Sequence, residues 1–150
     1  MWNKALICSL VLLFSPAGWA FTCYYNLAKG SCWGNYDVTV NVIDTEKSTV
    51  LLTVQIPKGK FWVQQQFPCD PAQKLMYQAK FNPVFWESDK NKVYSALRYW
   101  FMPGEINSGD SAWTIPVCFP KDFAEVPLPP DAPSGDCPCD FSTFPVIKPK

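Results

Sequence analysis

The chain has 150 residues, with 13 basic and 13 acidic side chains and a formal net charge of zero. A chain of this length suits one domain, and without a basic cluster it offers nucleic acid no electrostatic attraction. Histidine is absent, which removes the side chain that most often serves as general base and metal ligand near neutral pH. We therefore expect no enzyme of the Ser-His or Cys-His kind, no metal site and no cofactor.

The first twenty residues have the three-part pattern of a secretory signal peptide. Lys4 precedes an apolar run over 5–14, and small residues, Gly18 and Ala20, precede Phe21. The apolar run is shorter than the roughly 20 residues that a membrane-spanning helix needs. We predict removal of residues 1–20 and a secreted or periplasmic product without stable membrane insertion. An uncleaved N-terminal anchor is the alternative.

Six cysteines follow the leader, and an even number in a small exported domain predicts three disulfides. They are Cys23, Cys32, Cys69, Cys118, Cys137 and Cys139. Because Cys137 and Cys139 flank a single proline, a bond between them would close a strained ring.

The expected connectivity gives Cys137 and Cys139 separate partners. We predict a Cys69–Cys118 bond, with Cys23 and Cys32 joined to the Cys-Pro-Cys pair in either order. A local Cys23–Cys32 bond across a short, turn-rich N-terminal segment is the alternative.

Two functional interpretations of the cysteines are weaker than the structural one. A four-thiolate zinc site would use Cys23, Cys32, Cys137 and Cys139, but the spacing lacks the paired knuckles of structural zinc sites. A redox role would need a Cys-x-x-Cys motif at a helix start rather than Cys-Pro-Cys.

Alternating apolar and polar residues predict β-strands in the middle of the chain. Val38, Val40 and Val42 alternate with polar residues, and the same period of two returns over 50–56 after a polar connection. Two such runs with a short link are typical of a hairpin or meander.

Further strands are predicted over 61–67, 76–81 and 113–119, with Pro116 indicating an edge position or a bulge. The segment 93–101 fits a helix or a strand, and its aromatic content favours a strand. Short helices within 72–80 and 91–100 are the alternative. The pattern predicts an all-β fold, a small antiparallel β-sandwich of six to seven strands over 21–119.

Residues 120–150 are rich in proline, which cannot supply an inner strand. Apolar anchors and two cysteines nevertheless favour a disulfide-pinned C-terminal strap lying on the sandwich over a free tail; the apolar anchors are Phe119, Phe123, Phe141 and Phe144. Pro127 to Pro130 also resembles a polyproline ligand for an aromatic groove, but it lacks a basic flank.

The stretch from Val38 to Phe61, a strand, an Asp-containing turn, a strand, Pro-x-Gly and an aromatic strand, resembles segments of transthyretin-type or carboxypeptidase-regulatory-type sandwiches. The resemblance covers about a sixth of the chain. It implies a sandwich of transthyretin or immunoglobulin-like type and implies no function.

Candidate binding residues come from aromatic and amide side chains expected on the surface. Trp62 shares a predicted strand face with Gln64 and Gln66, which argues against deep burial. Trp86 follows Asn82-Pro83 and would suit a loop tip. Arg98, the single arginine, is expected beside Trp100 and Tyr94 on one face, where it would stack on an aromatic ring or pair with a carboxylate.

Carboxylates are concentrated in predicted turns, and nothing in the spacing selects a catalytic pair. They are Asp44, Glu46, Asp70, Glu87, Asp89, Glu105 and Asp110. A glycosidase could use two of them, but turns carry aspartate for hydrogen bonding alone. The same turns do not match an EF-hand calcium loop.

The sequence therefore favours a non-enzymatic structural or accessory subunit of an extracytoplasmic assembly, such as an envelope secretion or surface complex. Its expected partners are other envelope or surface proteins. The alternative is a carbohydrate-binding module that stacks exposed tryptophan and tyrosine on glycans.

Overall fold

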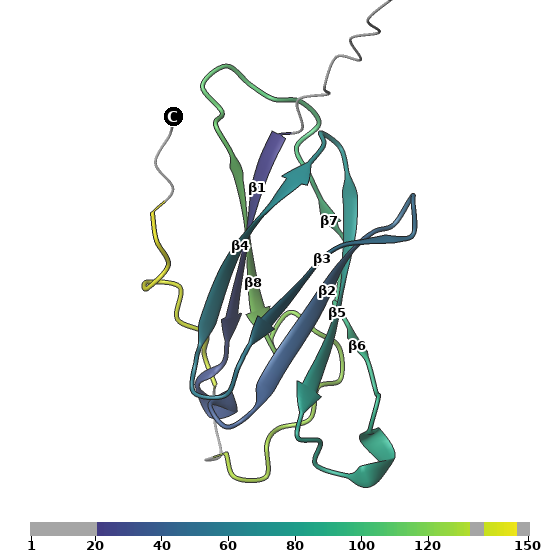
Figure 1. Ribbon diagram of the computed structural model, residues 1–150, viewed down its shortest axis with the longest axis vertical. Helices are drawn as coiled ribbons and strands as arrows, with labels where there is room; N and C mark the ends of the chain where they lie inside the picture. The colour runs from purple at the N-terminus through teal and green to yellow at the C-terminus, as the bar shows by residue number, and fades with distance from the viewer. Residues whose placement is uncertain (1–20, 133–136, 147–150) are drawn as a thin grey trace, which may run out of the picture.

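The computed structural model describes residues 21–132 and 137–146 (Figure 1). The predicted leader, residues 1–20, lies outside the described residues. Two sheets pack into a sandwich. The strands are β1 (Phe21–Lys29), β2 (Asp37–Asp44), β3 (Thr49–Ile56), β4 (Trp62–Cys69), β5 (Lys74–Asn82), β6 (Tyr94–Ser95), β7 (Trp100–Phe101) and β8 (Trp113–Phe119). Two 3₁₀ turns, η1 (Ser31–Trp33) and η2 (Glu87–Asp89), complete the described elements. No helix in the described part of the chain is long and apolar enough to cross a membrane.

The first sheet has the strand order β4-β1-β8, and the second has β3-β2-β5 with β6 and β7 both paired to β5. The predicted all-β sandwich is confirmed. Every pairing is antiparallel except that of β1 with β8, which is parallel. In immunoglobulin sandwiches the first strand lies beside the second, whereas here it lies between the fourth and the last.

The N-terminal segment is a central strand, which corrects the expectation of a turn-rich region between Cys23 and Cys32. β1 pairs with β4 on one side and β8 on the other. Both faces of its C-terminal half are covered, because Leu27 and Ala28 are adjacent in the strand and both fully buried. A strand buried on both faces has no apolar–polar alternation, so the period-two pattern that revealed the other strands is missing here.

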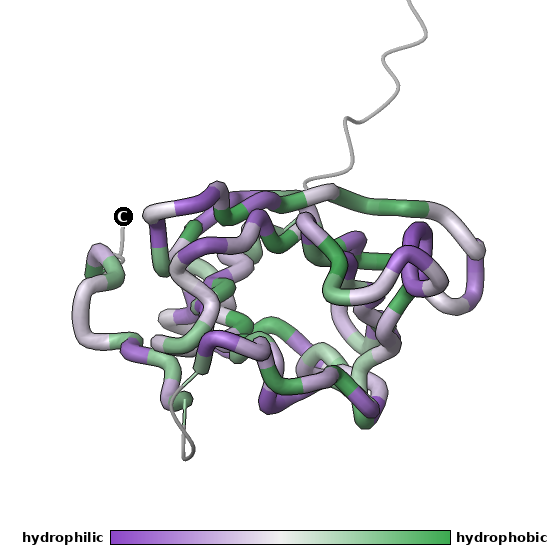
Figure 2. Tube along the Cα trace, turned by 90° about the horizontal axis from the view of Figure 1, so that it is seen from below, coloured by the Kyte–Doolittle hydropathy of each residue, from purple (hydrophilic) through white to green (hydrophobic). Residues whose placement is uncertain are grey.

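The core lies between the two sheets, whose layers are seen from below in Figure 2. In β2, Val38, Val40 and Val42 point into the core, while the residues between them are half-buried. At one end of the sandwich, Trp33 is fully buried and contacts Phe81 and Phe119 edge-on, with ring centroids 4.9 Å and 4.8 Å away. Such edge-to-face contacts add stabilisation beyond burial alone.

Three disulfides join the six cysteines, and their connectivity corrects part of the prediction. The pairs are Cys23–Cys69, Cys32–Cys137 and Cys118–Cys139. Separate partners for Cys137 and Cys139, and a bond from Cys32 to the Cys-Pro-Cys pair, were predicted correctly. The Cys69–Cys118 bond, the link from Cys23 to the Cys-Pro-Cys pair and the alternative Cys23–Cys32 bond were wrong.

The position of β1 explains this correction. It places Cys23 opposite Phe67 on β4. Cys69 lies two residues after Phe67, on the same face of that strand. The Cα atoms of the two cysteines are therefore 5.9 Å apart, a separation suited to a disulfide. Because the sequence pattern did not reveal β1, it could not show that Cys23 and Cys69 are neighbours.

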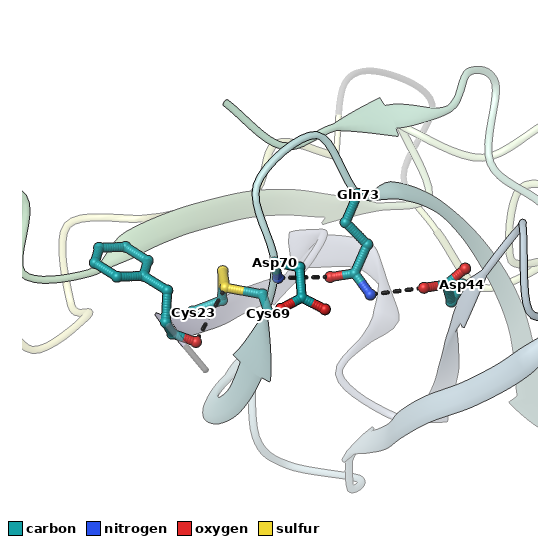
Figure 3. The surroundings of a disulfide bond; sticks show 6 residues. Cys23, Asp44, Cys69, Asp70 and Gln73 are labelled. Atoms are coloured by element: carbon teal, nitrogen blue, oxygen red, sulfur yellow. Dashed lines mark hydrogen bonds between the residues drawn. A yellow bond between two sulfur atoms is a disulfide. The ribbon is translucent and has the colours of Figure 1, made fainter. Parts of the chain in front are cut away.

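The turn after the Cys23–Cys69 disulfide is tied to the second sheet by Gln73 (Figure 3). The Gln73 oxygen accepts a hydrogen bond from the Asp70 backbone N–H at 3.1 Å, and its amide nitrogen donates to Asp44 at 2.7 Å. The buried Asp44 carboxylate also accepts from the backbone N–H groups of Glu46 and Lys47. One side chain thus joins the β4–β5 turn to the β2–β3 turn.

The C-terminal segment is fastened to the first sheet. Cys139 is bonded to Cys118 at the end of β8, and the backbone N–H of Ser31 donates to the Pro138 carbonyl at 3.1 Å. Further along, the Phe144 ring lies 5.0 Å from the Trp62 ring. Residues 141–146 run outside the two layers in both views (Figures 1 and 2). This segment is the predicted strap pinned by disulfides.

Candidate functional site

One edge of each sheet, β8 in the first and β6 with β7 in the second, faces the same side of the sandwich. β8 pairs only with β1, which confirms the edge position inferred from Pro116, and β6 and β7 pair only with β5. The expected strand over 93–101 is reduced to these two short pieces. Between them and β8 runs the segment 120–124, whose Ala124 N–H donates to the Ser95 carbonyl at 2.8 Å and whose Asp122 carbonyl accepts from Leu97 at 2.9 Å. This crossing covers β6 and leaves 98–101 uncovered.

A cavity of about 340 Å³ lies between the two edges. We call it the edge cavity; it is lined by Tyr77, Ala96, Leu97, Arg98, Tyr99, Trp100, Pro116, Val117, Lys121 and Asp122. Its lining comes from β5, the 96–100 segment, β8 and the crossing segment. Three parts of the chain that are distant in sequence, β5, the 96–100 segment, and β8 with the crossing segment that follows it, therefore converge on it.

Buried polar groups border the edge cavity. The Tyr77 hydroxyl and the Trp100 indole N–H are buried, and neither has a hydrogen-bond partner among the described residues. Burial, together with the nearby Asp122 carboxylate, raises the pKa of Tyr77 far above its usual value. The Tyr25 hydroxyl is also buried and has no hydrogen-bond partner among the described residues. Its pKa is raised mainly by burial and further by Tyr77 and Asp122. These phenols are therefore neutral at any physiological pH.

Three large apolar side chains project from the uncovered edge. Leu97, Tyr99 and Phe101 are 59%, 45% and 66% exposed, and we call them the edge patch. The Lys74 ammonium lies over the Tyr99 ring, 4.0 Å from its centroid. Exposed apolar groups gathered at one place mark interaction surfaces more often than scattered ones do.

The structure brings two of the predicted binding residues together, Arg98 and Trp100, which both line the edge cavity. Their expected neighbour Tyr94 is instead buried in the core, because the predicted strand is broken between β6 and β7. Arg98 is exposed, and no described ring or carboxylate engages its guanidinium, contrary to the expected stacking or pairing. Sequence reasoning missed Leu97, Tyr99 and Phe101, whose exposure depends on where the strand breaks.

Trp62, Gln64 and Gln66 share the outward face of β4 as expected. Trp62 is 37% exposed, because Phe144 of the strap covers part of its ring. Gln64 is half-buried and its amide donates to Asn26 on β1 at 2.9 Å, while Gln66 is exposed. Trp62 borders a separate cavity of about 370 Å³, beneath the strap.

Trp86 lies at a loop tip just before η2, as its position after Asn82-Pro83 suggested. It is 56% exposed and its ring meets Phe85 edge-on at 5.8 Å. It borders neither the edge cavity nor the cavity beside Trp62. The two tryptophans therefore do not line one groove.

Lys29 is a buried cation that no sequence pattern singles out. Its ammonium donates to the carbonyls of Tyr36 at 2.8 Å and Pro57 at 3.2 Å, which ties the end of β1 to two neighbouring turns. Burial lowers the pKa of Lys29 to about 8, against the opposing effect of the Asp37 charge. The contacts give it a structural role.

The described residues contain no group of three or more cysteine, aspartate or glutamate side chains placed to hold a metal ion. The cysteines considered for zinc are all in disulfides. Of the turn carboxylates, Asp44 caps backbone N–H groups, and hydrogen bonding to Gln73 and to Lys47 lowers its pKa despite burial. This is the hydrogen-bonding role that turns give aspartate.

Comparison of the chain with protein-family models, with curated proteins and with solved structures finds no match in any of the three. The three disulfides fit a protein of an oxidising, extracellular compartment.

Proposed function

We propose that this chain is a non-enzymatic, exported subunit of an extracytoplasmic assembly, either an envelope secretion complex or a surface complex. It acts as a structural or accessory component and contacts a partner protein through the edge patch. The compartment is that of the bacterial periplasm or the cell exterior.

The observation that carries the proposal is the edge patch beside two unpaired sheet edges. Exposed aromatic side chains next to an arginine, here Arg98, are residue types that are enriched in protein interfaces. Free strand edges invite pairing with another chain unless they are guarded. Pro116 guards β8, because proline offers no N–H to an added strand, so the patch on the β7 side is the favoured contact.

Co-purification from crosslinked cells of the native host tests this contact. We expect wild-type protein to recover specific envelope or surface proteins. A Tyr99→Ser/Phe101→Ser variant should recover several-fold less, because truncating central aromatic anchors commonly costs more than 1 kcal/mol each. The matched control is Val50→Ser/Leu128→Ser, which removes two exposed apolar side chains elsewhere and should leave recovery unchanged.

Equal recovery by the two double variants would contradict the assignment of the contact to the edge patch. Recovery of nothing above background by the wild type would contradict the assembly role itself. Both variants should first show wild-type thermal unfolding, since all four positions are exposed and surface changes usually have little effect on stability.

Glycan binding is the second candidate, and the partly exposed Trp62 ring is the observation that supports it. A sugar ring would stack on the exposed part of Trp62 beside Lys60 and Asp140, which border the same cavity. The observations support it less well, because Phe144 occupies part of the ring and Trp86 lies elsewhere. A glycan array in which Trp62→Ala abolishes a specific signal would favour it over the first proposal.

A further inference from the structure

We propose that the edge cavity is a binding site for a carboxylate group carried by the partner that docks on the edge patch. The inference rests on the proposed function and names the chemistry that the partner must present. The carboxylate belongs to the C-terminus of a polypeptide or to an aspartate or glutamate side chain, and the experiment below separates these sources.

Hydrogen-bond donors without acceptors are the first argument. The Trp100 indole can only donate, and its buried N–H has no partner in the described part of the chain. The Tyr77 side chain, 4% exposed, borders the same cavity, and its hydroxyl is equally unpartnered among the described residues. Buried donors of this kind are normally paired. Because each donor atom has less than 1 Å² of accessible surface, a ligand oxygen reaches it only with a shift of the Trp100 or Tyr77 side chain, and a ligand with acceptor oxygens is favoured over one without them.

Charge is the second argument. Arg98 and Lys121 border the cavity and are exposed, whereas Asp122 is its single acidic lining residue. One Asp122 oxygen is already engaged, because it accepts the Cys118 backbone N–H at 2.7 Å. The lining therefore has one positive charge in excess. A guanidinium whose fork is not engaged matches a carboxylate in two parallel hydrogen bonds.

Size and polarity are the third argument. The volume of about 340 Å³ is at the low end of small-ligand sites, enough for about one amino-acid residue. Ala96, Pro116 and Val117 supply an apolar wall, which suits the aliphatic or aromatic body that carries a carboxylate in a peptide. A partner strand lying along Tyr99 and Phe101 would bring such a group to the cavity mouth.

The test is a titration of the purified, disulfide-intact protein with capped dipeptides, followed by the ¹⁵N–¹H signal of the Trp100 indole. The signal is assigned with Trp100→Phe. The probes are acetyl-Val-Phe with a free C-terminus, acetyl-Glu-Phe-amide, and neutral acetyl-Gln-Phe-amide. We expect the indole signal to move with one or both carboxylate probes and not with the neutral one. The free-acid probe acting alone identifies a C-terminus, and the Glu probe acting alone identifies a side chain.

Arginine variants sharpen the test. Arg98→Gln should weaken binding about tenfold, the loss expected for a charge-assisted hydrogen bond, and Arg98→Lys should weaken it less. Lys80→Gln, an exposed lysine outside the edge cavity, should bind as wild type.

An indole signal that stays fixed up to about 10 mM probe, a very weak affinity, would overturn the carboxylate site. So would an equal response to the neutral probe. Either result would leave the edge patch itself to be judged by co-purification, so the two proposals fail separately.

Discussion

Asp44 shows how one buried carboxylate stabilises two turns. It accepts two backbone N–H groups and the Gln73 amide. These bonds favour the charged form and lower its pKa. Its contribution to stability is therefore present above the ordinary aspartate pKa and is lost as the pH falls through the lowered value.

We expect Asp44→Asn to destabilise the protein by about 1–3 kcal/mol at pH 7. The side-chain amide of the introduced asparagine would place its N–H₂ group against the N–H₂ group of Gln73. Two buried donors would then face each other without an acceptor. Urea unfolding at pH 7 measures the loss, with exposed Glu46→Gln as the control expected to stay within about 0.5 kcal/mol. An Asp44→Asn variant as stable as wild type would show that the Gln73 bridge is not maintained in solution.

Lys29 gives the molecule a pH dependence at the alkaline end. Its pKa is lowered to about 8 in the folded chain, while the unfolded chain keeps a value of about 10.4. The unfolded state therefore binds more protons between these values, and stability rises with pH across that window.

We expect the free energy of unfolding to increase by about 1–2 kcal/mol between pH 8 and pH 10. Above pH 10 it should fall again, because the buried phenols of Tyr25 and Tyr77 have raised pKa values and resist ionisation only in the folded state. Unfolding of wild type and Lys29→Met across this range tests the assignment. A rise of the same size in Lys29→Met would assign the effect to another group.

At the scale of the element, the strap depends on a close approach at Gly30. A Cβ placed there would lie 2.5 Å from the Cys137 carbonyl oxygen and 3.3 Å from that of Phe119. The Gly30 backbone has φ −57° and ψ 151°, which any residue adopts, so the restriction is contact with the strap rather than conformation.

Gly30→Ala should therefore destabilise by about 1–3 kcal/mol, the range for overpacking a tight site. Gly104→Ala is the matched control, because a Cβ there meets nothing within 4 Å. Thermal unfolding of both variants compares them directly. If the two variants melt alike, the strap does not lie against η1 as described.

The sequence predicted those elements whose residues alternate and failed where burial removes the alternation. Val38, Val40 and Val42 revealed β2 because one side of that strand is less buried than the other. β1 was missed because its C-terminal half is buried on both faces, and the Cys23–Cys69 bond was missed with it. No local pattern marks a central strand of this kind.

The candidate site was predictable only in part for a related reason. Arg98 and Trp100 stood out by residue type, yet the edge cavity also needs Tyr77, Val117 and Asp122, which topology alone brings together. Exposure of Phe101 follows from the shortness of β7, which pairs with β5 through two residues. Edge position is a property of the sheet and is absent from the local sequence.

At the scale of the whole molecule, the two sides of the sandwich differ. On one side the edge strands β3 and β4 follow each other in the chain and are joined directly by the connection 57–60. On the other, β8 and the β6–β7 edge are bridged only by the segment 120–124. Tyr99 and Phe101 of the edge patch lie just beyond that bridge, and both side chains are exposed. Contact with a partner at this place would bury apolar surface without rearranging the disulfide-bonded fold.

Site-specific photocrosslinking in the native host tests that claim most directly. A photoreactive phenylalanine analogue replaces Tyr99 or Phe101 in turn, and exposed Gln55 on β3 serves as the control position. We predict a discrete crosslinked species with one partner protein from positions 99 and 101 and none from position 55. Crosslinks of equal yield from all three positions, or crosslinks from 55 alone, would contradict a contact at the open edge.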